Sequence, residues 1–534
     1  MATAQTQRRW EAHCPNCGAP VAFTSAASAS AVCSYCRSTL LREGEHLRKI
    51  GQSAELFEDY SPLQLGATGR YAGAAFSVVG RLQMGYEEGS WNEWHVLFED
   101  GQGAGRSGWL SEDNGRFVIS FEAALGEPLP EPHQLVVGAQ QVLGGQAWQV
   151  ASKVMAHVVA AQGELPHAPA LSGSFAVVDL RNRQDEVATL DYSDPRGPAW
   201  SVGRALRLAE LQMSGLREDA AKGLGAQSLP CPCCGAALSP KLENTQSIVC
   251  GQCQAVVDLS KGVGADLAYY AQEHGLEPLI PLGSTGLLAL SGGTPQSWQV
   301  VGYLERCDLP SDAEDEQSFW REYLIYNRLE GFAFLVDAED GWSVVRPLTG
   351  APQRSSGNAV LWQDKRFALR WTYTAKVTHV LGEFYWRIQR EERALVSDYE
   401  WKNGSRLELL SREQTGNEVT WSHGRRLDAE ELRRAFALPE SQHAALRRDV
   451  GSSAGHGGAG LLVKIVVGLM LLALAFALLR GCSRRDDCQS YKDAYGEASS
   501  EYQQCQRNSS GSGVRIGSGG GSYGGYSSGG GGHK

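Results

Sequence analysis

The stretch CPNCGAPVAFTSAASASAVCSYC, residues 14–36, contains two C-x-x-C pairs, and CPCCGAALSPKLENTQSIVCGQC, residues 231–253, repeats the pattern. In both stretches fifteen residues separate the two pairs. Each C-x-x-C turn can direct two thiolates to one point, and two such turns complete a tetrahedral zinc site. The spacing therefore predicts two zinc ribbons, at residues 10–40 and 227–257, each with a short hairpin between its cysteine pairs.

The cysteines of these pairs are the predicted metal ligands, and they occupy all four coordination positions of the metal in each site. They are Cys14, Cys17, Cys33, Cys36, Cys231, Cys234, Cys250 and Cys253. A zinc site without an open position is structural rather than catalytic. A redox dithiol or an iron–sulfur centre is less favoured, because neither pair lies in a thioredoxin-like βαβ context. Cys233 stands where Asn16 stands in the first stretch, so we expect no ligand role for it.

The chain after each cluster is repeated as well, which points to a duplicated unit. The turn LGATG at residues 65–69 returns as LGSTG at 282–286, and WNEW at 91–94 returns as WREY at 320–323. Two shorter motifs repeat with them, namely VVG ending at Gly80 and Gly302, and a GE pair at residues 163–164 and 382–383. The predicted order is ribbon, domain, ribbon, domain, with the domains at residues 53–225 and 265–440.

Short segments rich in Val, Tyr, Trp and Phe fill both domains, and clusters of Gly, Asp, Asn and Glu divide them. Segments such as RFVISF at residues 116–121 and FAFLVDAEDGW at 332–342 indicate strands joined by hairpins. Local helical signals occur at residues 263–275 and at 428–438, where Asp428 is a plausible N-cap. We therefore expect a mainly β (α+β) fold, antiparallel in each repeat.

The repeated motifs resemble those of a bacterial family known only as domain of unknown function 4178. The shared features are the LG-x-TG turn, the VVG strand, the W-x-E-aromatic strand and the GE-x-x-W stretch, and two copies cover most of residues 53–440. The first copy departs from the pattern, because it lacks the Trp found at 386. The resemblance implies a membrane-associated protein with tandem domains and no assigned reaction. Family members are often encoded near spermidine-synthase-like genes, an association that fits an acidic protein near polycations.

The most distinctive repeated polar side chains are Glu93 beside Trp91 and Glu322 beside Trp320. Positions i and i+2 share one face of a strand, so each carboxylate lies next to its indole. One interpretation is a ligand pocket in which the indole face and the carboxylate hold an amine. The other is a strand face with the Trp in the core and the Glu at its rim. No nucleophile elbow, P-loop or H-E-x-x-H motif accompanies these residues, so we predict no catalytic residue.

The charge of the chain disfavours nucleic acid as its main partner. The net charge is −11, whereas phosphate binding depends on Lys and Arg. An acidic body permits cationic ligands or basic partner surfaces. The first 50 residues have a small excess of basic side chains, so nucleic-acid binding through the ribbons is kept as the least favoured alternative.

The apolar run LLVKIVVGLMLLALAFALL, residues 461–479, predicts one C-terminal transmembrane helix. As a helix it spans about 28 Å, close to the thickness of the hydrocarbon core. Its one charge, Lys464, is near an end and can reach the interface. A flexible linker at residues 449–460 precedes the run. A polar tail at 480–534 follows it and is Gly/Ser-rich and disordered from about residue 509.

We expect a single-pass protein of the bacterial inner membrane with the bulk of the chain in the cytosol. The N-terminal residues show no secretory signal, and thiolate zinc sites suit a reducing compartment. Basic residues flank the apolar run on both sides, so the positive-inside rule does not decide the orientation. If the tail lies outside the cytosol, Cys488 and Cys505 are candidates for a disulfide.

The sequence favours a non-enzymatic adaptor or scaffold anchored in the membrane. In this interpretation the ribbons brace the β domains, which present a surface to a protein partner or to a small cationic ligand. The alternative is an enzyme or ligand-processing module in polyamine-related metabolism. An open cleft shared by the two Trp–Glu pairs would favour ligand chemistry, and buried, separate indoles would favour the scaffold.

Overall fold

The structure, a computed structural model, describes residues 10–447 with short internal gaps. All of the described residues belong to one compact unit, Met1–Arg448 with Gly520–Lys534, and the other unit is Asp449–Gly519. The gaps in the described part are residues 24–27, 44–45, 54–60, 88, 100–105, 114–115, 218–228, 243–244, 261–266, 274, 291–293, 310–316, 357, 390 and 405.

The C-terminal predictions fall outside the described residues. They comprise the linker at 449–460, the transmembrane helix at 461–479, the tail at 480–534 and the disulfide between Cys488 and Cys505. Within residues 10–447, where they are described, no helix combines the length and the apolar character that a membrane crossing requires.

Each four-cysteine stretch folds as a small ribbon of short antiparallel strands. In the first ribbon β1 pairs with β2, and β3, β4 and β5 form a second sheet. In the second ribbon β16 pairs with β17, and β18, β19 and β20 follow in the same order. The strands are β1 (Trp10–His13), β2 (Pro20–Phe23), β3 (Ser30–Val32), β4 (Ser38–Glu43), β5 (His46–Gln52), β16 (Leu229–Pro230), β17 (Ala237–Leu238), β18 (Ser247–Val249), β19 (Val256–Asp258) and β20 (Tyr269–Tyr270).

The helix predicted at residues 263–275 is wrong. Tyr269 and Tyr270 form β20 and pair with Val257 and Val256 of β19. Tyrosine and valine side chains suit a strand pair, so pairing with the ribbon overrides the local helical signal.

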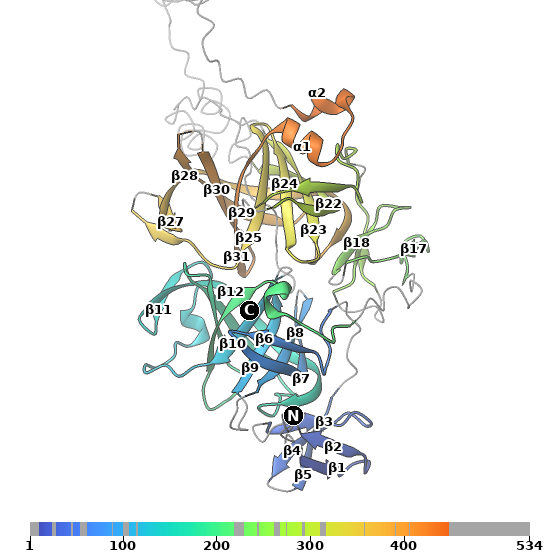
Figure 1. The fold of residues 1–534 in the computed structure, drawn as a ribbon, viewed down its shortest axis with the longest axis vertical. Helices are drawn as coiled ribbons and strands as arrows, with labels where there is room; N and C mark the ends of the chain where they lie inside the picture. Colours follow the sequence, from blue (N-terminus) through green and yellow to red (C-terminus); the bar gives the residue numbers. More distant parts are fainter. Residues whose placement is uncertain are drawn as a thin grey trace, which may run out of the picture. The chain divides into compact units, whose positions relative to one another are not determined.

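The first repeat closes eight antiparallel strands into a barrel, each strand hydrogen-bonded to the next (Figure 1). In ring order they are β7 (Ala74–Tyr86), β8 (Gly89–Phe98), β9 (Arg106–Asp113), β10 (Arg116–Glu122), β15 (Ala199–Leu206), β14 (Glu186–Asp191), β13 (Phe175–Arg181) and β12 (Gln146–Leu165). The long strand β12 closes the ring because its first half pairs with β13 and its second half with β7. Outside the ring lie β6 (Thr68–Tyr71), β11 (Gln140–Leu143) and the 3-10 turns η1 (Pro132–Gln134) and η2 (Leu208–Leu211).

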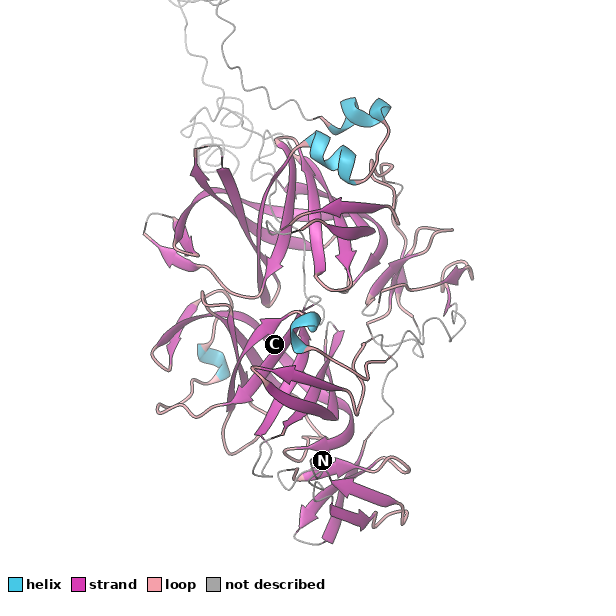
Figure 2. Cartoon of the chain, in the orientation of Figure 1, coloured by secondary structure: helices cyan, strands magenta, loops and turns pink. Residues whose placement is uncertain are grey.

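The second repeat has the same ring. In ring order its strands are β22 (Gln296–Leu309), β23 (Phe319–Asn327), β24 (Gly331–Ala338), β25 (Gly341–Leu348), β31 (Glu418–Leu427), β30 (Arg406–Thr415), β29 (Arg393–Asn403) and β28 (Lys365–Phe384), which returns to β22. Outside the ring lie β21 (Thr285–Leu288), β26 (Gln353–Ser355) and β27 (Ala359–Trp362). Figure 2 shows that strands dominate the described chain, so the mainly β, antiparallel fold class is confirmed.

The described helices follow the last strand of the second repeat. They are α1 (Ala429–Ala435), the 3-10 turn η4 (Glu440–Gln442) and α2 (His443–Leu446). The predicted N-cap is confirmed, because the Asp428 carboxylate accepts the backbone N–H groups of Glu430 and Glu431. Leu432 of α1 packs into a buried cluster with Trp342 of β25, so the helices cover apolar side chains of the sheet.

A second buried cluster fills the interior of the same ring. It contains Leu304 of β22, Leu324 of β23, Phe334 of β24 and Val396 of β29. Strands β22, β23, β24, β25, β28 and β29 contribute to it, and residues of the second ribbon such as Val249 belong to it as well. Burial of these side chains supplies the main stabilisation of the repeat, at about 1.5–3 kcal/mol for each large apolar group.

Candidate functional sites: the cysteine clusters and the repeat junction

Each set of four cysteines converges on one point. The distances between Sγ atoms are 3.6 Å for Cys14–Cys36 and 3.7 Å for Cys17–Cys33, and the second ribbon gives 3.8 and 3.7 Å for the equivalent pairs. A tetrahedron with Zn–S bonds of about 2.3 Å has edges of about 3.8 Å. In each cluster all four sulfur atoms lie within 4.8 Å of one another, so both clusters could hold a metal ion.

Each C-x-x-C pair forms the same backbone turn. In the first turn Gly18 donates its N–H to Cys14 O at 2.8 Å, and Cys14 donates its own to Ala19 O at 2.8 Å. The residue after the second cysteine has a positive φ, +76° at both Gly18 and Gly235, where glycine avoids the strain of a side chain. Cys233 is exposed and belongs to neither cluster, as expected.

Each ribbon adds a strand to the end of the long closing strand of its barrel. In the first repeat Ala31 of β3 pairs with Glu164 of β12. In the second repeat Ile248 of β18 pairs with Glu383 of β28. The GE pairs detected in the sequence therefore mark the positions where the ribbons dock.

The carboxylate of Glu383 anchors the second ribbon further. It accepts hydrogen bonds from the backbone N–H groups of Lys241 at 2.7 Å and Leu242 at 3.1 Å, and from the Thr245 hydroxyl at 2.9 Å. These donors lie in the part of the ribbon that leads into β18. Glu383 is therefore a structural acceptor that holds the ribbon against its barrel.

The VVG and GE motifs meet where two backbones cross. Gly80 pairs with Gly163 in the first repeat, and Gly302 pairs with Gly382 in the second. Gly163 and Gly382 have φ values of +69° and +91°. A Cβ added to Gly382 would lie 2.2 Å from the carbonyl oxygen of Val301. Both motifs thus need glycine because nothing larger fits between the strands.

Replacing Gly382 by Ala is expected to destabilise the second repeat by roughly 2–4 kcal/mol, because backbone atoms must move to admit the new methyl group. The measurement is the thermal unfolding midpoint of the full-length protein in detergent. The control is Gly283→Ala, since Gly283 also has a positive φ, +84°, but its Cβ would meet no atom within 4 Å. An equal loss of stability in both variants would contradict close packing as the cause.

The two Trp–Glu pairs are buried. Trp91 donates its indole N–H to the Glu93 carboxylate at 3.1 Å, and Trp320 donates to Glu322 at 2.8 Å. The predicted contact between indole and carboxylate is therefore present in both repeats. Each pair lies in the core of its own repeat, and none of the four residues lines a hollow described below.

An arginine of the second repeat occupies the position expected for a ligand amine. Arg306 pairs with Trp320 across the strands, and its guanidinium carbon lies 5.5 Å from the indole centroid. Its Nη1 donates to Glu322 Oε1 at 3.0 Å and to Glu413 Oε1 at 2.9 Å. All three charged side chains are buried. Burial raises the pKa of Glu413 to about 7, and one retained proton leaves the group of one Arg and two Glu neutral.

The first repeat differs at this position, since Met84 pairs with Trp91 where Arg306 pairs with Trp320. The repeats therefore share the Trp–Glu pair but not the arginine. The structure favours the interpretation of these pairs as parts of the core.

The two repeats contact each other within the compact unit, at a surface that we call the junction. Trp421 of β31 donates its indole N–H to Gln149 of β12 at 2.7 Å, in a buried position. Arg207 of the first repeat forms an ion pair with Glu330 of the second at 2.8 Å. The sequence offered no signal for the junction, because its residues come from scattered strands and turns.

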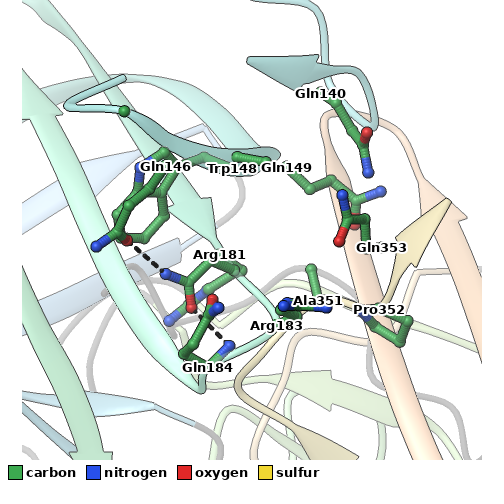
Figure 3. Close-up of a pocket in the computed structure, with 13 residues that line it drawn as sticks. Gln140, Gln146, Trp148, Gln149, Arg181, Arg183, Gln184, Ala351, Pro352 and Gln353 are labelled. Carbon is green, nitrogen blue, oxygen red and sulfur yellow. Dashed lines mark hydrogen bonds between the residues drawn. The ribbon is translucent and has the colours of Figure 1, made fainter. Parts of the chain in front are cut away.

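A row of hollows follows the junction. The first hollow, of about 250 Å³, is lined mainly by amide and guanidinium groups (Figure 3). Its polar side chains include Gln140, Gln146, Gln149, Arg181, Asn182, Arg183, Gln184 and Gln353. Asn182 is held in place by a hydrogen bond to Gln146 Oε1 at 3.1 Å. One narrower hollow shares Gln149 and Arg181 with the first, and a second narrower hollow shares Leu348 and Thr349 with that one. The second leads to a larger hollow of about 450 Å³, with which it shares three charged residues.

Comparison with protein families matches both barrels. The family described as "Domain of unknown function (DUF4178)" matches residues 64–208 and 295–429, and a four-cysteine cluster precedes each match. No match was found among curated proteins.

Comparison with solved structures found a protein of unknown function from the DUF3598 family of Nostoc punctiforme. It shares 8% sequence identity with the chain, and the alignment covers 70% of this chain and 100% of that protein, with a TM-score of 0.11. A likeness at this level carries no argument about function.

Proposed function

Because the chain belongs to the DUF4178 family, whose description assigns no activity, we propose a function from the geometry of its two repeats. The chain is a non-enzymatic adaptor, in which two metal-stabilised ribbons brace two barrels and the joined barrels bind a protein partner. The observation that carries this proposal is the docking of each ribbon, by strand pairing, onto the closing strand of its barrel.

Zinc is the metal of both clusters in this proposal. Four thiolates at tetrahedral spacing suit zinc, and a site fully ligated by protein has no position for substrate. The cysteines would hold the ion and supply rigidity rather than chemistry. The ribbons then act as fixed braces for the surface of each barrel.

The proposal places the adaptor at the bacterial inner membrane. The apolar run at residues 461–479 anchors the chain as a single-pass helix, and the bulk of the protein stays in the cytosol. A reducing compartment keeps the eight thiolates available for zinc. The Gly/Ser-rich stretch between the last barrel and the run allows the barrels to reach a partner near the membrane.

A protein partner is favoured over a small cation bound at the Trp–Glu pairs. The Glu322 carboxylate already pairs with Arg306, and that guanidinium lies over the indole where a bound amine would lie. This leaves the polyamine-processing alternative without a site at the second pair.

The adaptor proposal is tested by affinity capture of the full-length protein from solubilised membranes. Wild type is compared with a Cys14→Ser/Cys231→Ser variant at matched expression, and with Cys233→Ser as the control. We expect a partner to be enriched by wild type and by the control, and to be lost from the double variant. The reason is that unfolded ribbons no longer hold the surfaces of the two barrels in place.

Two outcomes would contradict the proposal. Capture of no partner by wild type argues against an adaptor. A partner captured equally by the double variant shows that the binding surface does not depend on the ribbons.

A further inference from the structure

The larger hollow at the junction is lined by three arginines that come from both repeats. Arg116 begins β10 and Arg207 directly follows β15 in the first repeat, whereas Arg346 lies on β25 of the second. The hollow has a volume of about 450 Å³, and Glu330 is the one acidic residue in its lining. The lining therefore has a formal charge of +2 in a protein whose net charge is −11.

The carboxylate of Glu330 is shared between two of these arginines. Arg207 Nη1 donates to its Oε1 at 2.8 Å, and Arg346 donates to its Oε2 at 3.2 and 3.3 Å. Arg116 is half-buried and has no side-chain hydrogen bond or ion pair with any residue in the described part of the chain. Its donors are therefore open to a ligand.

The arginine side chains around this hollow repel one another electrostatically. The pKa of Arg346 is lowered by burial first and then by the charge of Arg116, with a smaller contribution from Arg207, whereas Glu330 acts in the opposite direction. An anion in the hollow would offset both the burial and the repulsion. Taken together, the linings of the row of hollows are also positive, with five arginines and two glutamates, Glu330 and Glu418.

An aromatic side chain lines the same hollow. Trp298 is buried, and the centroid of its ring lies 5.7 Å from the guanidinium carbon of Arg346. Leu288 and Leu290 lie in the same lining and add apolar surface. The combination suits a ligand that carries an anionic group next to an apolar part.

We propose that this hollow binds a small ligand through an oxyanion, a phosphate or carboxylate group, held by the guanidinium groups of Arg116, Arg207 and Arg346. Guanidinium presents paired N–H donors that match the oxygen atoms of both groups. The ligand contacts both repeats, so its binding stabilises the junction. A site of this kind makes the association of the two barrels sensitive to the concentration of an anionic metabolite.

The test is calorimetric titration of the full-length protein in detergent with phenyl phosphate and, separately, with benzoate, at constant ionic strength. These probes distinguish phosphate from carboxylate and carry the same apolar ring. We expect binding of at least one probe to wild type. Arg116→Ala is expected to weaken that binding by about tenfold to hundredfold, the effect of losing charge-assisted hydrogen bonds.

Arg116 is the informative position because no hydrogen bond or ion pair holds its side chain in the described part of the chain, so its replacement leaves the Glu330 ion pairs in place. The control is Arg70→Ala, which removes the same charge from an exposed position on β6 outside every hollow described above. Arg70→Ala should bind like wild type. Absence of binding by both probes, or equal affinity in wild type and Arg116→Ala, overturns the proposal.

Discussion

Replacing Cys231 by Ser is expected to release one metal ion and to unfold the second ribbon. Zinc contributes about 10–16 kcal/mol to the folding of small zinc peptides, and the ribbon's own core is small. Its strands have only two or three residues each, and the core around the cluster consists of a few side chains such as Leu238, Ile248 and Val257. Without the ion, β18 loses the geometry that pairs it with β28.

The measurements for this prediction are the zinc content of the purified protein and hydrogen exchange at residues 247–258. Wild type should hold two zinc ions per chain and the variant one, with fast exchange confined to the second ribbon and the end of β28. Cys233→Ser is the matched control, because Cys233 is exposed and lies outside the cluster. Two zinc ions in Cys231→Ser would show that this cluster is not the site.

Replacing Arg306 by Met is expected to destabilise the second repeat by about 3–5 kcal/mol, the usual cost of breaking a buried ion pair. The change leaves Glu322 and Glu413 buried without their cation. Methionine is the residue that the first repeat carries at the equivalent position, Met84, so the substitution tests charge more than shape. The measurement is the urea dependence of unfolding followed by tryptophan fluorescence, and unchanged stability would contradict the role of the pair.

Glu413→Gln is the companion variant, because it keeps the pair of Arg306 and Glu322 and should change stability little at neutral pH. The effect of this variant should appear in the pH dependence of the free energy of unfolding. Burial raises the pKa of Glu413 in the folded protein to about 7, above the value of about 4.3 in the unfolded chain. The folded state then holds this proton more tightly than the unfolded chain does. The resulting contribution to the free energy of unfolding is fully present below about pH 4 and is lost as the pH rises through about 7. The Gln variant should lack this decline.

The local features of the fold were predictable because their causes are local. Fifteen residues between C-x-x-C pairs bring two turns together, and the four sulfur atoms of each cluster converge as the spacing predicts. Trp320 and Glu322 lie on one strand face, so their contact follows from strand geometry alone. The N-cap at Asp428 likewise depends only on residues within one turn.

Long-range pairings were not predictable from the same patterns. Strand periodicity identifies which face is apolar but not which strand lies alongside. The docking of β3 onto β12 pairs Ala31 with Glu164, and no sequence pattern near either residue indicates its partner. The motifs around Gly302 and Gly382 were visible as repeats, but their shared cause, a close crossing of two backbones, appears only once the strands are paired.

The role of the Trp–Glu pairs depended on a third residue. Arg306 lies fourteen positions before Trp320 and reaches it across the strand pair, so the sequence did not show that the carboxylate has a cation of its own. The grouping of the junction arginines could not be predicted from the sequence for a similar reason. Arg116, Arg207 and Arg346 are far apart in the chain and have no motif in common.

The closing strands β12 and β28 have a consequence for how the chain folds. Each ring closes only when the last part of its long strand finds β7 or β22, after about 70 to 80 residues of intervening chain have formed hairpins. Such a search is slow because a long loop must be closed before its contacts stabilise it. A ribbon that folds early around a bound metal ion would offer the end of β12 or β28 a preformed edge. Metal supply during synthesis would then set the rate at which each barrel matures, as well as its final stability.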